Sequence, residues 1–123
     1  MTVSKSDIAS KVLNRYSGIP SAVTSTIIQE WVEDCHIVIE NSTGDSFTTS
    51  DIPIEYQALI TDMTVIYLLD YLITGNVSLG DFSMSFRELI AQKKLIEERV
   101  ERQLSDVVRN TASGLVETTE PSL

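Results

Sequence analysis

The segment from Ile54 to Ile73 limits the possible folds of this chain more than any other, because its apolar residues do not share one side. On a helical projection they point in every direction: Ile54, Leu59, Ile60, Met63, Val65, Ile66, Tyr67, Leu68, Leu69 and Leu72. A helix that is apolar all round is buried all round. In a chain of 123 residues, only a central position or coverage by a neighbouring subunit provides such burial. Asp51 and Pro53 precede the segment in the order expected of a cap residue and a first-turn proline.

Two helices are expected before this segment. The first runs from about Ser6 to Tyr16 and is stopped by Gly18 and Pro20. The second runs from about Ser21 to Glu40. One broad arc of the second helix is apolar, with Ile27, Ile28, Trp31, Cys35, Val38 and Ile39. Such an arc is typical of an amphipathic helix that packs one face on a core.

The region after the apolar segment begins with a strand-like pattern and continues as a long helix. From Val77 to Phe86, the apolar residues Phe82, Met84 and Phe86 alternate with serines. A strand this short is not stable alone, so it needs a partner strand or an apolar surface. A fourth helix is expected from about Arg87 to Asn110.

Together these patterns predict an all-α, mostly helical fold. Residues 1–110 are expected to form a small four-helix domain with a long C-terminal helix and a short strand or hairpin before it. Residues 111–123 form a polar, acidic tail that we expect to be flexible until it is bound. Leu115 and Val116 give this tail a short apolar anchor.

The charge of the chain argues against a grip on nucleic acid or on an anionic membrane. There are nine Lys and Arg residues against eighteen Asp and Glu residues, a net charge of −9. Binding to phosphates normally needs a basic surface, since Lys and Arg release condensed counterions. The longest apolar run, Met63 to Ile73, contains Asp70 and is much shorter than the ~20 residues of a bilayer span.

No arrangement of residues in the sequence points to catalysis. The single histidine, His36, directly follows the single cysteine, Cys35. Neighbours on a helix point about 100° apart, so this pair does not form a nucleophile and base. We expect Cys35 to be a buried apolar residue and His36 to lie at the edge of the buried face. No glycine-rich phosphate loop is present, so neither catalytic residues nor a cofactor or metal site is expected.

Several apolar residues stand where a monomer would not place them. Ile37 falls on the polar arc of the second helix, and Leu95 lies on the charged side of the fourth. Phe82, Met84 and Phe86 lie on a strand without an evident partner. Single exposed apolar residues mean little, but several such features favour subunit interfaces. These five residues, with Leu115 and Val116, are the expected subunit or portal contacts.

The predicted elements follow one another in a recognisable order. A short helix, a helix that contains Trp31, a polar loop and Asp-x-Pro at 51–53 precede the very apolar helix. The stretch Leu79-Gly80-Asp81-Phe82-Ser83-Met84-Ser85-Phe86 then leads into a long charged helix. Over about residues 4–110, this order resembles the head–tail connector (adaptor) proteins of tailed bacteriophages.

The resemblance implies a structural virion protein. Such proteins form a homo-oligomeric ring, usually of twelve subunits, that docks under the portal of the capsid and accepts the stopper or tail on its other side. The chain would then be assembled in the host cytoplasm and lie in the virion neck. DNA would pass through the ring without specific binding, which the net charge of −9 suits.

Two other roles remain open from the sequence. One is another neck protein, such as a stopper or tail terminator, although these tend to be rich in β-structure. The other is a cytosolic helical adaptor or an acidic regulatory protein that mimics the charge of DNA. An adaptor for one partner should be a monomer or dimer, whereas a connector should form rings or join portal rings.

Overall fold

The described part of the chain folds into four helices, α1 (Lys5–Arg15), α2 (Ser25–Thr43), α3 (Ile54–Thr74) and α4 (Phe86–Thr119). The structure is a computed structural model that describes residues 2–75, 82 and 84–119, with side chains described as far as residue 109. Within these ranges the only β-structure is a single antiparallel bridge between Val3 and Ile52. The all-α prediction is therefore confirmed.

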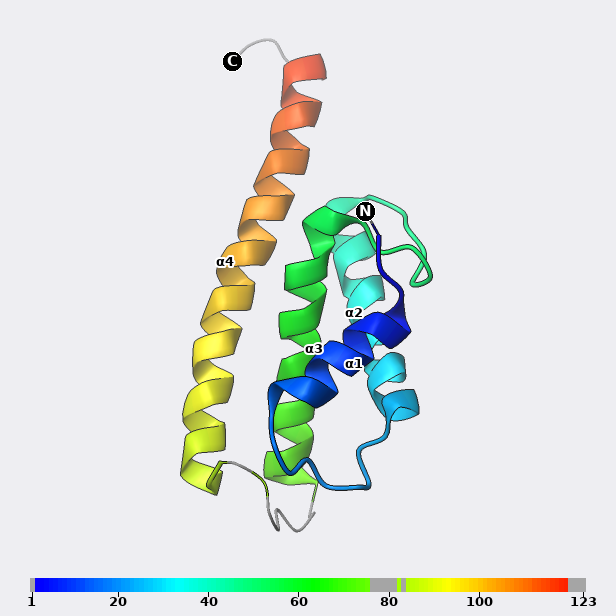
Figure 1. The fold of residues 1–123 in the computed structure, drawn as a ribbon. Coiled ribbons are helices and arrows are strands. Elements are labelled where there is room, and N and C mark those ends of the chain that lie inside the picture. The colour runs from blue at the N-terminus through cyan, green and yellow to red at the C-terminus, as the bar shows by residue number, and fades with distance from the viewer. Residues whose placement is uncertain (1, 76–81, 83, 120–123) are drawn as a thin grey trace.

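Helix α3 lies at the centre of the molecule, as its all-round apolar surface predicts. It contacts α1, α2 and α4, and Figure 1 shows α4 along one side of it and α1 and α2 on the other. Its buried residues face several directions: Tyr56, Leu59, Ile60, Asp62, Met63, Thr64, Val65, Leu68, Leu69 and Leu72. Most of this burial is supplied by the domain itself, so coverage by a neighbouring subunit is not required.

Short side-chain caps fix where the first two helices begin. Ser4 and Asp7 form a reciprocal capping box, in which the Ser4 N–H donates to the Asp7 carboxylate at 2.9 Å. Helix α2 begins after Thr24, later than expected at Ser21, because the Thr24 hydroxyl accepts from the Ile27 N–H. It ends at Thr43, after the expected Glu40, and is followed by Gly44, whose φ of 80° is a left-handed conformation suited to glycine.

The start of α3 differs from the prediction that Asp51 caps the helix and Pro53 lies in its first turn. Pro53 is the residue before the helix and not a member of its first turn, with an extended ψ of 150° and no side-chain hydrogen bond to the helix. Asp51 therefore does not cap α3. Its carboxylate instead accepts from the Thr2 hydroxyl at 3.3 Å, next to the Val3–Ile52 bridge.

Helix α4 begins earlier and ends later than expected. Phe86 is its first residue and so does not belong to a strand. Ser85 caps it, because the Ser85 hydroxyl accepts from the Glu88 N–H at 3.3 Å while the Ser85 N–H donates to the Glu88 carboxylate at 2.8 Å. Neither Phe82 nor Met84 is in a strand, and the rest of the expected strand, residues 77–81 and 83, lies outside the described residues.

The backbone of α4 continues past the expected end at Asn110 to Thr119. Figure 1 shows its C-terminal part projecting beyond the other three helices. The prediction of a tail that is flexible until bound is not tested by this helix, and it stays a prediction.

A buried carboxylate joins α4 to the rest of the domain. Asp62 of α3 is only 6% exposed, and Arg99 of α4 donates to both of its oxygens at 2.8 Å. Arg15 of α1 donates to the same carboxylate at 3.3 Å. The Asp62 hydrogen bonds raise the pKa of Arg99 above its ordinary value. This group, called the Asp62 clamp below, connects three helices through one acidic residue.

Candidate functional site: apolar surfaces and an aromatic groove

Three of the expected contact residues are exposed. The side chains of Ile37, Phe86 and Leu95 are 53%, 52% and 61% exposed. They lie on the exposed side of α2, at the first residue of α4 and in the N-terminal third of α4. The prediction that Ile37 and Leu95 lie on polar faces is confirmed, while their role as contacts stays a prediction.

Phe82 and Met84 do not join this exposed set. Phe82 is only 8% exposed, and its ring centroid lies 5.8 Å from that of Tyr16 at the end of α1. Met84 is partly buried against the same core. The expectation that all three residues of this segment need another chain is therefore wrong for Phe82, because its own domain supplies the apolar surface. Leu115 and Val116 lie where the side chains of α4 are not described.

Sequence reasoning missed three further exposed apolar residues, Val38, Ile54 and Ile90. Val38 was expected inside, but the buried stripe of α2 instead contains Val32, with Ile28, Cys35 and Ile39. A stripe with the spacing i, i+4, i+7, i+11 through Ile28 would have identified Val32. Ile90 follows Phe86 by four residues and so shares its side of α4.

The exposed apolar residues of α4 lie on two different flanks. At about 100° per residue, Leu95 points almost opposite to Phe86. The buried residues Leu89 and Ile96 face the core between these two directions. Phe86 and Ile90 therefore form one flank of α4, and Leu95 forms the other. We call these the Phe86 flank and the Leu95 flank.

A groove lined by aromatic rings opens between α2, α3 and α4. Its volume is about 450 Å³, and its lining consists of Trp31, Ile66, Tyr67, Asp70, Tyr71, Thr74, Lys93 and Glu97. The ring of Trp31 lies 6.3 Å from that of Tyr67 and 5.9 Å from that of Tyr71, both tilted. All three rings are only partly buried. We call this the aromatic groove.

The charged residues of the aromatic groove are arranged around one lysine. The Lys93 ammonium lies 3.0 Å from the Asp70 carboxylate and 3.9 Å from that of Glu97. Burial raises the pKa of the Tyr67 hydroxyl above its ordinary value, and the nearby negative charge of Asp34 adds to this. The groove therefore combines an aromatic wall with a rim of carboxylates.

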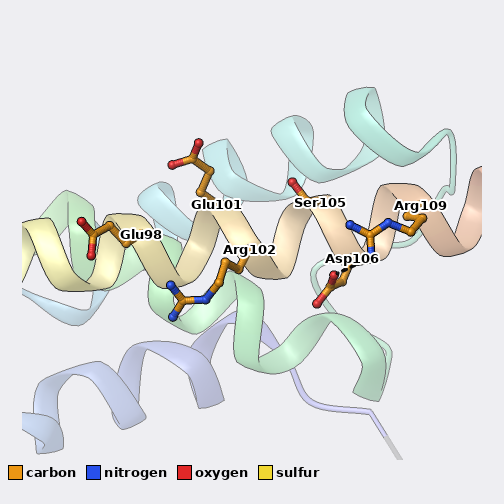
Figure 2. A pocket seen from close by; sticks show the side chains of 6 residues that line it. All are labelled: Glu98, Glu101, Arg102, Ser105, Asp106 and Arg109. Carbon is orange, nitrogen blue, oxygen red and sulfur yellow. Dashed lines mark hydrogen bonds and ion pairs between the residues drawn. The ribbon is translucent and has the colours of Figure 1, made fainter.

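The charged face of α4 has a different character. Figure 2 shows Glu98, Glu101, Arg102, Ser105, Asp106 and Arg109, all of which come from α4. The ion pair drawn among them joins Arg109 to Asp106 at 3.4 Å, and both side chains are largely exposed. All six residues are exposed, so this surface is a solvated helix face and not a site.

Cys35 and His36 lie as expected and do not act together. Cys35 is fully buried, and its burial raises the pKa of the thiol to about 12. His36 lies at the edge of the core, where its Nε2 contacts the Phe47 carbonyl oxygen and lies 3.2 Å from the Glu40 carboxylate. The thiol contacts Thr64 instead, at 3.8 Å. A buried thiol of this kind is inert at neutral pH.

Two other features are absent from the part of the chain that the structure describes. No group of three or more His, Cys, Asp or Glu residues there could hold a metal ion. No helix in that part is both long enough and apolar enough to cross a bilayer.

Comparison with known protein families, with curated proteins and with solved structures gives no match to this chain.

Proposed function

We propose that this chain is a structural virion protein, one subunit of a ring adaptor between the capsid portal and the tail or stopper. The observation that carries the proposal is the presence of large exposed apolar residues on both flanks of α4. The Phe86 flank holds Phe86 and Ile90, and the Leu95 flank holds Leu95. The resemblance of the sequence to head–tail connectors supplies the portal and the tail as partners.

Two different flanks suit a ring better than a symmetric dimer. In a twofold dimer the same patch meets its own copy, whereas a ring is built from two different patches that meet head to tail. Burial of one exposed leucine or phenylalanine contributes about 1.5–3 kcal/mol. Repeated at every subunit boundary, such contacts stabilise a closed ring without any single large interface.

The charge and the shape of the chain are consistent with a DNA channel and an axial contact. A net charge of −9 disfavours adhesion of DNA to a duct through which it must pass. The C-terminal part of α4 projects beyond the other helices (Figure 1), so it is available to a partner stacked on the ring. The virion neck is then the site of function, after assembly in the host cytoplasm.

Leu95→Asp tests the proposal. The change should leave the helical content of the isolated subunit intact by circular dichroism, because Leu95 is largely exposed. It should also shift sedimentation from ring to monomer and weaken binding to purified portal. Ser105→Asp is a matched control, since it adds the same charge to the solvated face of Figure 2. Unchanged assembly of Leu95→Asp would exclude the Leu95 flank as an interface.

The same sedimentation experiment on the unaltered chain separates the alternatives. A chain that stays a monomer or dimer at every concentration, and that does not join portal rings, would favour a cytosolic adaptor or acidic regulatory protein. Negative-stain images with purified portal distinguish a ring that docks on the portal from another neck protein that does not.

A further inference from the structure

The aromatic groove already holds a cation from its own chain. Lys93 reaches across to Asp70 at 3.0 Å and lies 3.9 Å from Glu97, beside the rings of Trp31 and Tyr71. A side chain of α4 that spans to α3 in this way shows that the two carboxylates accept an ammonium group at the groove. Asp70 and Glu97 are both about half exposed, so a second cation can reach them from solvent.

The groove has the composition of a site for a planar cation. Aromatic faces attract guanidinium groups, which also stack on them, and carboxylates accept the guanidinium N–H groups two at a time. Ammonium groups are more strongly hydrated and lack the flat face. Lys93 is therefore a weaker occupant than an arginine would be at the same place.

The balance of charge favours a basic partner over a second copy of this chain. Negative charges outnumber positive ones around the groove, where the carboxylates of Asp70, Glu97 and the nearby Asp34 stand against the one ammonium group of Lys93. The chain as a whole carries −9, so two copies repel each other except where apolar contacts dominate. A partner segment with positive charge gains from the field of the whole molecule.

We propose that the aromatic groove binds an arginine-bearing segment of a partner protein, whose guanidinium displaces Lys93 from Asp70 and Glu97 and stacks on Trp31 and Tyr71. Ile66 and the outer edges of the rings receive the apolar residues that flank the arginine. The site does not depend on ring formation, because every residue named lies within one chain.

A peptide titration tests the site, with Trp31 as the natural reporter. Trp31 is the single tryptophan of the chain, so its fluorescence and its indole N–H signal report on the groove alone. The probe is acetyl-Ala-Leu-Arg-Leu-Ala-amide, and its control carries citrulline, which has the shape of arginine without the charge. The arginine peptide should bind saturably and on the order of tenfold more tightly than the citrulline peptide.

Two substitutions give opposite expected effects. Lys93→Met removes the resident cation and should tighten binding of the arginine peptide several-fold, whereas Asp70→Asn should weaken it several-fold. Glu98→Gln, on the solvated face in Figure 2, is the matched control and should change little. A gain of affinity in Lys93→Met is the distinctive result, because a general loss of structure cannot produce it.

Three results would overturn the proposal. The first is equal affinity for the arginine and citrulline peptides, and the second is no gain of affinity for the arginine peptide in Lys93→Met. The third is an affinity for N-acetyl-arginine amide equal to that for the peptide, because this result would indicate a small-molecule site. The titration is done in the Leu95→Asp background at a concentration where sedimentation shows a monomer. Absence of peptide binding in this experiment therefore counts against the arginine site alone and is distinguished from a failure of ring assembly.

Discussion

Replacement of Asp62 by asparagine tests whether one buried carboxylate holds α4 against the other helices. The Asp62 side chain is 9% exposed, and it receives both hydrogen bonds of Arg99 and one from Arg15. Loss of one member of a fully buried ion pair costs about 3–5 kcal/mol. The Arg99 side chain is 43% exposed, so water compensates part of the loss, and about 2 kcal/mol is expected for Asp62→Asn.

The assay is urea unfolding followed by circular dichroism, with Arg99→Gln and the double variant measured beside Asp62→Asn. If the clamp acts as one unit, the double variant should lose little more than either single variant, with a coupling free energy of at least about 1 kcal/mol. Arg102→Gln is the control, since Arg102 lies exposed on the solvated face of α4, and it should change the free energy of unfolding by less than about 0.5 kcal/mol. The Asp62 clamp would be refuted if the losses in the free energy of unfolding of the two single variants added up in the double variant, or if Asp62→Asn left the free energy of unfolding unchanged.

Three further predictions follow from the described contacts. Phe82→Ala should cost roughly 3 kcal/mol of unfolding free energy, because Phe82 packs on Tyr16 in the core. Phe86→Ala removes an exposed ring and should cost under about 0.5 kcal/mol. Equal costs of the two substitutions in urea unfolding would contradict the core position of Phe82. Cys35, whose thiol pKa is raised to about 12, should react with a disulfide reagent at pH 8 only after unfolding in urea, and fast reaction in the folded chain would show that it is accessible. The hydrogen bond from the Ser85 N–H lowers the pKa of Glu88, so the cap is stabilising above the ordinary glutamate pKa near 4.5 and this contribution is lost as the pH falls below it. The Glu88→Gln variant should therefore lose less stability than the natural chain between pH 6 and 3. Identical acid unfolding curves of the two chains would exclude this role.

The helical architecture could be predicted from the pattern of apolar residues alone. A helix that is apolar all round needs cover on every side, from a central position or from a neighbouring subunit, and α3 takes the central position. The exposure of Ile37 and Leu95 followed from the same periodicity. These are local properties of single helices, which is why one sequence is sufficient to find them.

The features that the sequence did not reveal depend on more than one helix or on short-range capping. Phe82 was misplaced because the surface that covers it, Tyr16 of α1, is far away in the sequence. The Asp62 clamp was not predicted for the same reason, although Asp62 has apolar residues close to it on both sides in α3 and, once buried, needs a partner. The start of α4 could have been found, since Ser85 and Glu88 have the spacing of a capping box.

The aromatic groove shows the same limit. The sequence places Trp31 on the apolar arc of one helix and Tyr67 among the apolar residues of another, and it assigns Tyr71 to neither pattern. These three rings form one open wall beside Lys93 only because of the way in which α2, α3 and α4 pack together. No periodicity within one helix contains that information.

The most direct test of the central claim is chemical cross-linking between the two flanks of α4. A variant with both Phe86→Cys and Leu95→Cys is treated with a short bismaleimide, while the natural Cys35 stays buried and unreactive. If subunits meet head to tail through these flanks, the products should form a ladder that ends at the closed ring, and each single variant should form at most a weak dimer band. A dimer as the sole product of the double variant, or no product at all, would contradict the proposed ring.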